Sequence, residues 1–78
     1  MLSKPGLWDI RYPISDIRSV FIAVYDITGK QVSILVNEKK VAGEHDVKLN
    51  TSDLPGGFYI IRLLAGNEST VRKLLVAH

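Results

Sequence analysis

Hydrophobic and polar residues alternate over most of the chain, in short segments that end at Gly, Pro, Asn or Asp. Alternation with period two sends successive side chains to opposite faces of a β-strand, whereas long runs with helical spacing of apolar residues are hard to find. The pattern therefore predicts an all-β chain in which six strands are visible.

The first two segments predict strands in different surroundings. Segment 10–14 alternates and contains Pro13, which cannot donate to a ladder, so this strand should lie at a sheet edge or pair on one side only. Segment 20–25 is apolar at every position. That is typical of a strand that is either central or covered on its outer side.

A tight reversal is predicted directly after this segment. In Asp26-Ile27-Thr28-Gly29 the Asp26 carboxylate can accept a hydrogen bond from the backbone N–H two residues on, and Gly29 can take a positive φ. The return strand should carry Val32, Ile34 and Val36 on one face.

The second half of the chain predicts further strands. His45, Val47 and Leu49 should share one face of a half-buried strand. The segments that follow predict, in chain order, a crossing loop, an apolar strand, a hairpin turn and a last strand: 50–57, 58–64, 65–68 and 70–76. Strands at this spacing favour a two-sheet antiparallel sandwich.

Composition limits the domain to one small globule, since the chain has 78 residues, 46% hydrophobic and 23% charged. We expect residues 1–9 to be a loose N-terminal segment or a truncated first strand, and residues 10–78 to form the sandwich. The formal charge of +2 gives no reason to expect a nucleic-acid partner. No stretch reaches the roughly 18 apolar residues of a transmembrane segment.

We expect no catalytic residue, no cofactor and no metal. The chain has no Cys, and its serines lack a nucleophile-elbow sequence. Glu44 and Asp46 flank His45, but in a strand their side chains point to the opposite face, so the three cannot form a ligand set.

Five motifs occur in a fixed order between Ile10 and Val76: Val24-Tyr25-Asp26, Gly29-Lys30-Gln31-Val32, Gly43-Glu44-His45, Asp53-Leu54 ahead of Gly57-Phe58-Tyr59, and Arg72-Lys73-Leu74-Leu75-Val76. The ordered set resembles the type A C-terminal sorting domain of the type IX (Por) secretion system. That family is related to the immunoglobulin-like domain of the flagellar hook-capping protein.

The resemblance implies an immunoglobulin- or fibronectin III-like β-sandwich of six to seven strands. It implies a non-catalytic domain at the end of a longer precursor in Bacteroidetes, which directs an upstream cargo domain to the cell surface. The implied partners are outer-membrane type IX components and a sortase-like peptidase that attaches the cargo to lipopolysaccharide.

Seven residues are expected to hold this architecture: Tyr25, Asp26, Gly29, Gly43, His45, Gly57 and Tyr59. The three glycines mark backbone positions that need a positive φ or a close approach. Tyr25 and Tyr59 should bury their rings and send their hydroxyls to backbone partners.

Recognition by the secretion machinery is expected at Arg72, Lys73, Leu74, Leu75 and Val76. In a strand Arg72 and Lys73 face opposite ways. They either guard a sheet edge against aggregation or belong to a strand that a receptor reads by β-augmentation. Phe21 and Ala23 leave an apolar surface, which is covered by an upstream part of the protein or contacts a partner.

Two other functions stay open on the sequence alone. The first is an accessory module of an extracellular hydrolase that binds carbohydrate or protein, for which Trp8 is the exposed aromatic candidate. The second is a structural assembly domain like that of the hook-capping protein, which would self-associate through Phe21 and Ala23.

Overall fold

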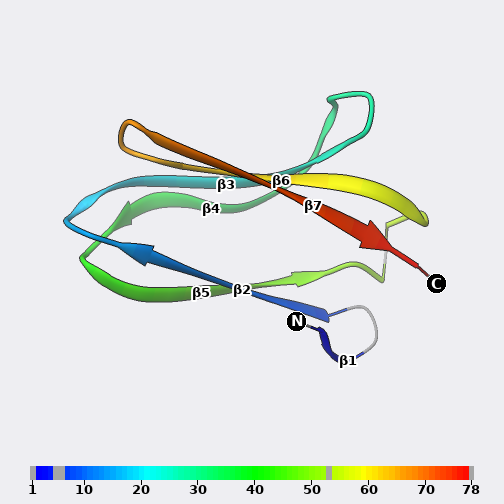
Figure 1. Cartoon of the computed structure of the whole chain (residues 1–78), viewed down its shortest axis with the longest axis horizontal. Helices are drawn as coiled ribbons and strands as arrows, with labels where there is room; N and C mark the ends of the chain where they lie inside the picture. Colours follow the sequence, from blue (N-terminus) through cyan, green and yellow to red (C-terminus); the bar gives the residue numbers. More distant parts are fainter. Residues whose placement is uncertain (1, 5–6, 53, 78) are drawn as a thin grey trace.

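The computed structural model describes residues 2–4, 7–52 and 54–77, and in this part of the chain all regular structure is β-strand. Two antiparallel layers face each other (Figure 1). The strands are β1 (Leu2–Lys4), β2 (Leu7–Ile14), β3 (Arg18–Asp26), β4 (Gln31–Lys40), β5 (Gly43–Asn50), β6 (Gly57–Ala65) and β7 (Glu68–Val76). The predicted all-β sandwich is confirmed.

One layer has the strand order β1-β2-β5 and the other the order β4-β3-β6-β7. Of the two surroundings predicted for segment 20–25, the structure shows the central one, because β3 pairs with both β4 and β6. In β2, Pro13 pairs with Glu44 of β5, while β1 reaches only Leu7 and Trp8. The strand is therefore paired on one side at the proline, as its missing N–H requires.

The core lies between the two layers. Its centre is β3, where Val20, Ile22 and Val24 are at most 1% exposed. The half-buried strand β5 presents His45, Val47 and Leu49 to this core, as its alternation predicts. The buried apolar cluster draws on both layers: Tyr12, Ile14, Val20, Ile22, Val24, Val36, Leu49, Tyr59, Ile61, Ala65, Leu74 and Val76.

Two register shifts in β4 overturn the prediction that Val32, Ile34 and Val36 share one face. Ile22 pairs with Val36 and its neighbour Ala23 with Ile34, which leaves Leu35 as an extra residue. Val36 is consequently buried, whereas Ile34 is 51% exposed. A β-bulge inserts one residue and moves the following side chains to the other face, so period-two counting fails across it.

The predicted reversal after β3 is confirmed. Asp26 Oδ1 accepts hydrogen bonds from the Thr28 and Lys30 backbone N–H groups at 2.9 and 3.0 Å and from the Thr28 hydroxyl at 2.6 Å. These bonds, led by that of the Thr28 hydroxyl, hold the pKa of Asp26 below its ordinary value of 3.8. Gly29 closes the turn with a φ of 90°, a conformation that side chains disfavour.

Candidate functional site

The last strand, β7, forms one edge of the four-stranded sheet. It pairs with β6 through an unbroken register of nine residue pairs, from Ala65–Glu68 to Gly57–Val76. Among the described strands none pairs with its other side. Backbone N–H and C=O groups along this edge are consequently open to another strand.

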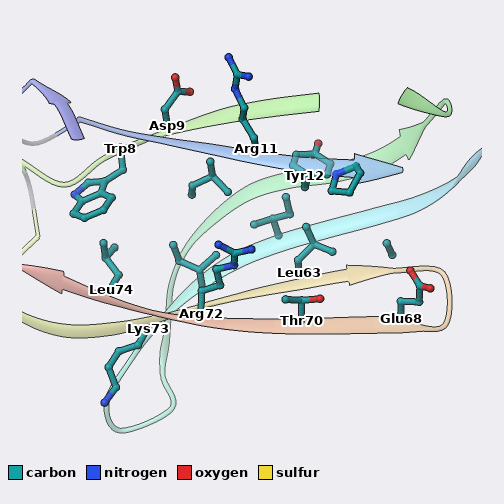
Figure 2. A pocket seen from close by; sticks show the side chains of 15 residues that line it. Trp8, Asp9, Arg11, Tyr12, Leu63, Glu68, Thr70, Arg72, Lys73 and Leu74 are labelled. Atoms are coloured by element: carbon teal, nitrogen blue, oxygen red, sulfur yellow. The ribbon is translucent and has the colours of Figure 1, made fainter. Parts of the chain in front are cut away.

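Alternation along β7 separates the five residues expected to be recognised. Leu74 and Val76 are buried in the core at 4% and 3% exposure, so neither offers its side chain to a partner. Leu75 points the other way and is 52% exposed. The expected opposite directions of Arg72 and Lys73 are visible in Figure 2, where Lys73 points away from the interior. The five residues therefore serve the core and two separate surfaces.

A groove of about 380 Å³ opens between the two layers, with β2 on one side and β6 and β7 on the other. Trp8 and Leu74 point into it from opposite layers (Figure 2). Its lining is chiefly apolar, with charged groups at the rim: Trp8, Asp9, Ile10, Arg11, Tyr12, Pro13, Ile22, Ile61, Leu63, Ala65, Glu68, Thr70, Arg72, Lys73 and Leu74.

Arg72 occupies an inward position of β7, opposite Ile61, yet its side chain remains exposed at the groove. It forms no ion pair with any described residue. The groove therefore has an apolar floor, and Arg72 lies at it without an ion-pair partner among the described residues. The open edge of β7 lies beside it.

The surface predicted at Phe21 and Ala23 lies on the outer face of the four-stranded sheet. The structure supports Phe21 as part of it and corrects Ala23. Phe21 is partly exposed there, beside Leu64 of β6. Ala23, by contrast, is 0% exposed. It pairs with Ile34 and Arg62, longer residues of the two flanking strands, so Ala23 cannot contact a partner.

The two motif tyrosines, Tyr25 and Tyr59, differ in the burial of their rings. Tyr59 is 5% exposed and its hydroxyl donates to the Pro55 carbonyl at 2.6 Å, as expected. Tyr25 follows the buried Val24 on the opposite face and pairs with Ile60, which places its ring on the partly exposed outer side. The expectation that the Tyr25 ring is buried is wrong because β3 has two apolar faces and only the inner one meets the other layer.

The motif glycines and His45 take structural positions. Gly29, Gly43 and Gly57 all have positive φ, with 90°, 133° and 144°. His45 stacks on Tyr12 with ring centroids 5.6 Å apart, and its Nε2 lies 2.7 Å from the Val41 carbonyl oxygen. No three metal-ligating side chains converge within residues 2–4, 7–52 and 54–77.

Trp8 does not stand out as an exposed aromatic. It is partly buried and packs against the core cluster, with its ring at the groove. The aromatic surface that a carbohydrate-binding module uses is therefore not built around this residue.

Sequence reasoning missed several residues of the outer face. Phe58, Ile60 and Leu64 point outward from β6 and are 49%, 36% and 36% exposed. They belong to the apolar run 58–64, and alternation within that run, with Tyr59 and Ile61 inward, was the signal that could have located them.

Comparison with known proteins identifies one family. Residues 8–77 match the secretion system C-terminal sorting domain. The search of curated proteins found no match, and the search of solved structures found none either. In the described part of the chain, no helix has the length and apolar character to cross a bilayer.

Proposed function

The chain belongs to the family of secretion system C-terminal sorting domains, which mark proteins for type IX secretion to the cell surface, and from this premise we propose that β7 is the element that the secretion machinery reads. The domain acts as a folded, non-catalytic address on a larger cargo chain. Outer-membrane type IX components bind it, and a sortase-like peptidase then separates the cargo from it.

The unpaired edge of β7 is the observation that carries this proposal. Strand addition at a sheet edge draws its affinity from main-chain hydrogen bonds, and its specificity from side chains on alternate positions. Nine residues of β7 lie in regular register and provide such an edge. Because backbone pairing does not depend on a particular side chain, one receptor can recognise domains of different sequence.

The opposite edge of the same sheet supports the assignment to β7. Both register shifts of this sheet lie in β4, at Leu35 and Val32. Bulges twist an edge strand and interrupt the row of groups that a further strand would need. Of the two edges, β7 is therefore the one built to accept a strand.

A reporter assay tests the sorting role. Residues 1–78 are fused behind a signal peptide and a reporter in a bacterium that has the type IX system. We expect the reporter on the cell surface. A folded fusion that stays in the periplasm would refute the sorting role.

Paired proline variants test the edge. In an antiparallel ladder, neighbouring residues direct their N–H groups alternately to the partner strand and away from it. Of Arg72→Pro and Lys73→Pro, one therefore removes a bond to β6 and unfolds the strand, while the other removes an N–H from the open edge. We expect the variant that stays folded, judged by circular dichroism, to lose delivery.

Arg72→Ala and Lys73→Ala are the matched controls, since they remove the same side chains and keep the backbone N–H. If the folded proline variant is delivered as well as its alanine control, backbone pairing at β7 is not how the domain is recognised.

A further inference from the structure

Exposed hydrophobic residues concentrate on one surface. In the described part of the chain ten large hydrophobic residues are exposed, and six of them lie on the outer face of the four-stranded sheet. These six define what we call the outer patch: Ile34, Phe58, Ile60, Leu64, Val71 and Leu75. Monomeric domains rarely leave such a contiguous surface without a use.

Strand register makes the outer patch continuous. Val71, Arg62, Ala23 and Ile34 form one row across the four strands, and Leu75 lies beside Phe58 in another. Ala23 keeps the middle of the sheet low, because its side chain is a single methyl group and is fully covered. The patch is thus a broad apolar surface whose middle, at Ala23, is shallow.

Two cations lie within the patch. Lys73 pairs with Ile60 and Arg62 pairs with Val71, so the two are diagonal neighbours, a separation of about 7–8 Å between residues of this kind. The ammonium of Lys73 lies 5.2 Å from the centre of the Phe58 ring. Neither cation forms an ion pair with a described residue, and no described residue facing outward from these four strands is acidic.

We propose that the outer patch docks on a protein surface that is apolar and presents carboxylates to Arg62 and Lys73. The inference rests on the proposed sorting function and names the chemistry of its partner. Apolar contact supplies affinity, and the two cations select a partner of complementary charge. Strand β7 provides both the open edge and part of the outer patch, so one partner reaches both.

Two other occupants fit the patch less well. A second copy placed face to face would bring Arg62 and Lys73 against the same cations, and like charges in an interface oppose association. A membrane would have to bury both cations, because they lie among the apolar side chains and not around them.

Photo-crosslinking tests the docking directly. A benzophenone amino acid replaces Val71 in the full fusion, in a bacterium with the type IX system. The matched control carries it at Ile27, which is 75% exposed but lies in the turn after β3. We expect an adduct with an outer-membrane protein from position 71 and none from position 27. The combined change Arg62→Glu and Lys73→Glu should abolish this adduct, while Arg62→Lys should preserve it.

A delivery measurement complements the adduct. Val71→Ser with Leu75→Ser should lower surface delivery by about tenfold, equivalent to about 1.4 kcal/mol of binding. Ile27→Ser with Val41→Ser replaces side chains that are even more exposed, at 75% and 62%, but lie away from the patch, and should leave delivery unchanged. Thermal melts verify that all variants remain folded.

The outcomes separate this inference from the proposed function. Delivery of the unsubstituted fusion without a charge-dependent adduct overturns the docking surface alone. A charge-dependent adduct with a fusion that stays in the periplasm overturns the sorting role and leaves the docking surface standing. Dimers of purified 1–78 that Val71→Ser disrupts, or co-sedimentation with phosphatidylglycerol vesicles that Arg62→Glu disrupts, would replace the protein partner by a second copy or a lipid surface.

Discussion

The two faces of the four-stranded sheet are both apolar, yet only one of them is core. The inner face meets the three-stranded layer and buries Ile22 and Leu74 almost completely, whereas the outer face leaves Val71 and Leu75 about half exposed. The outer face also carries Arg62 and Lys73 among its apolar residues, and neither cation forms an ion pair with a described residue. Hydrophobicity alone therefore does not identify the core of this sandwich, and an apolar face that carries cations is better understood as a contact surface.

Neighbouring leucines on β7 give the sharpest test of this contrast. Leu74→Ala leaves a cavity between the layers and should lower the free energy of unfolding by about 2–5 kcal/mol. Urea denaturation measures the loss. A loss below about 1 kcal/mol would mean that the inner face near Leu74 is not tightly packed.

An intermediate effect is expected at the inner end of β6. Tyr59→Phe removes the hydroxyl that donates to the Pro55 carbonyl and should cost about 0.5–1.5 kcal/mol, the net contribution of one hydrogen bond. The same denaturation assay applies. An unchanged stability would show that solvent replaces the hydroxyl at the carbonyl.

A small effect on stability is expected on the outer face. Leu75→Ala removes a side chain that is 52% exposed and should change the free energy of unfolding by no more than about 0.5 kcal/mol. Surface delivery of a reporter fused to this variant should nevertheless fall. If Leu75→Ala destabilises the fold as much as Leu74→Ala, the two faces do not differ as described.

The smallest effect on stability is expected at the turn that begins at Asp26, which belongs to neither face of the sheet. Hydrogen bonds from Thr28 and Lys30 lower the pKa of the folded-state carboxyl below 3.8, so the ionised form stabilises the fold above that value. This stability is lost as the pH falls below 3.8 towards the folded-state pKa. Melting temperatures between about pH 5 and pH 2 should therefore show a weaker acid dependence in Asp26→Asn than in the unsubstituted chain. Identical profiles would mean that the turn does not favour the ionised carboxylate.

Local patterns predicted the parts of the fold that local forces determine. A continuous apolar run indicated β3, alternation located the inward face of β5, and Asp26 with Gly29 located the turn. The extra residue at Leu35 escaped prediction because a bulge has no hydrophobic periodicity. Ala23 escaped for another reason, since its burial depends on Ile34 and Arg62 from two other strands.

Long-range polar contacts were beyond a local pattern as well. The Arg18 guanidinium donates to the Ala65 carbonyl at 3.3 Å and to the Glu68 carboxylate at 3.3 Å, across 47 and 50 residues. No residue close to Arg18 in the sequence indicates that Ala65 and Glu68 are its partners. The candidate site shows the same division: β7 was located from its own residues, but the separation of its side chains among core, groove and outer patch required the register with β6.

The unequal edges of the four-stranded sheet also limit how copies of the domain can join. A fibril grows only if each subunit pairs through two opposite edges, so that every addition exposes a fresh one. Here the bulges in β4 obstruct one edge, and a strand added to β7 uses up the other. Pairing through this sheet stops after a single event. Copies of the domain that lie close together therefore do not polymerise through this sheet.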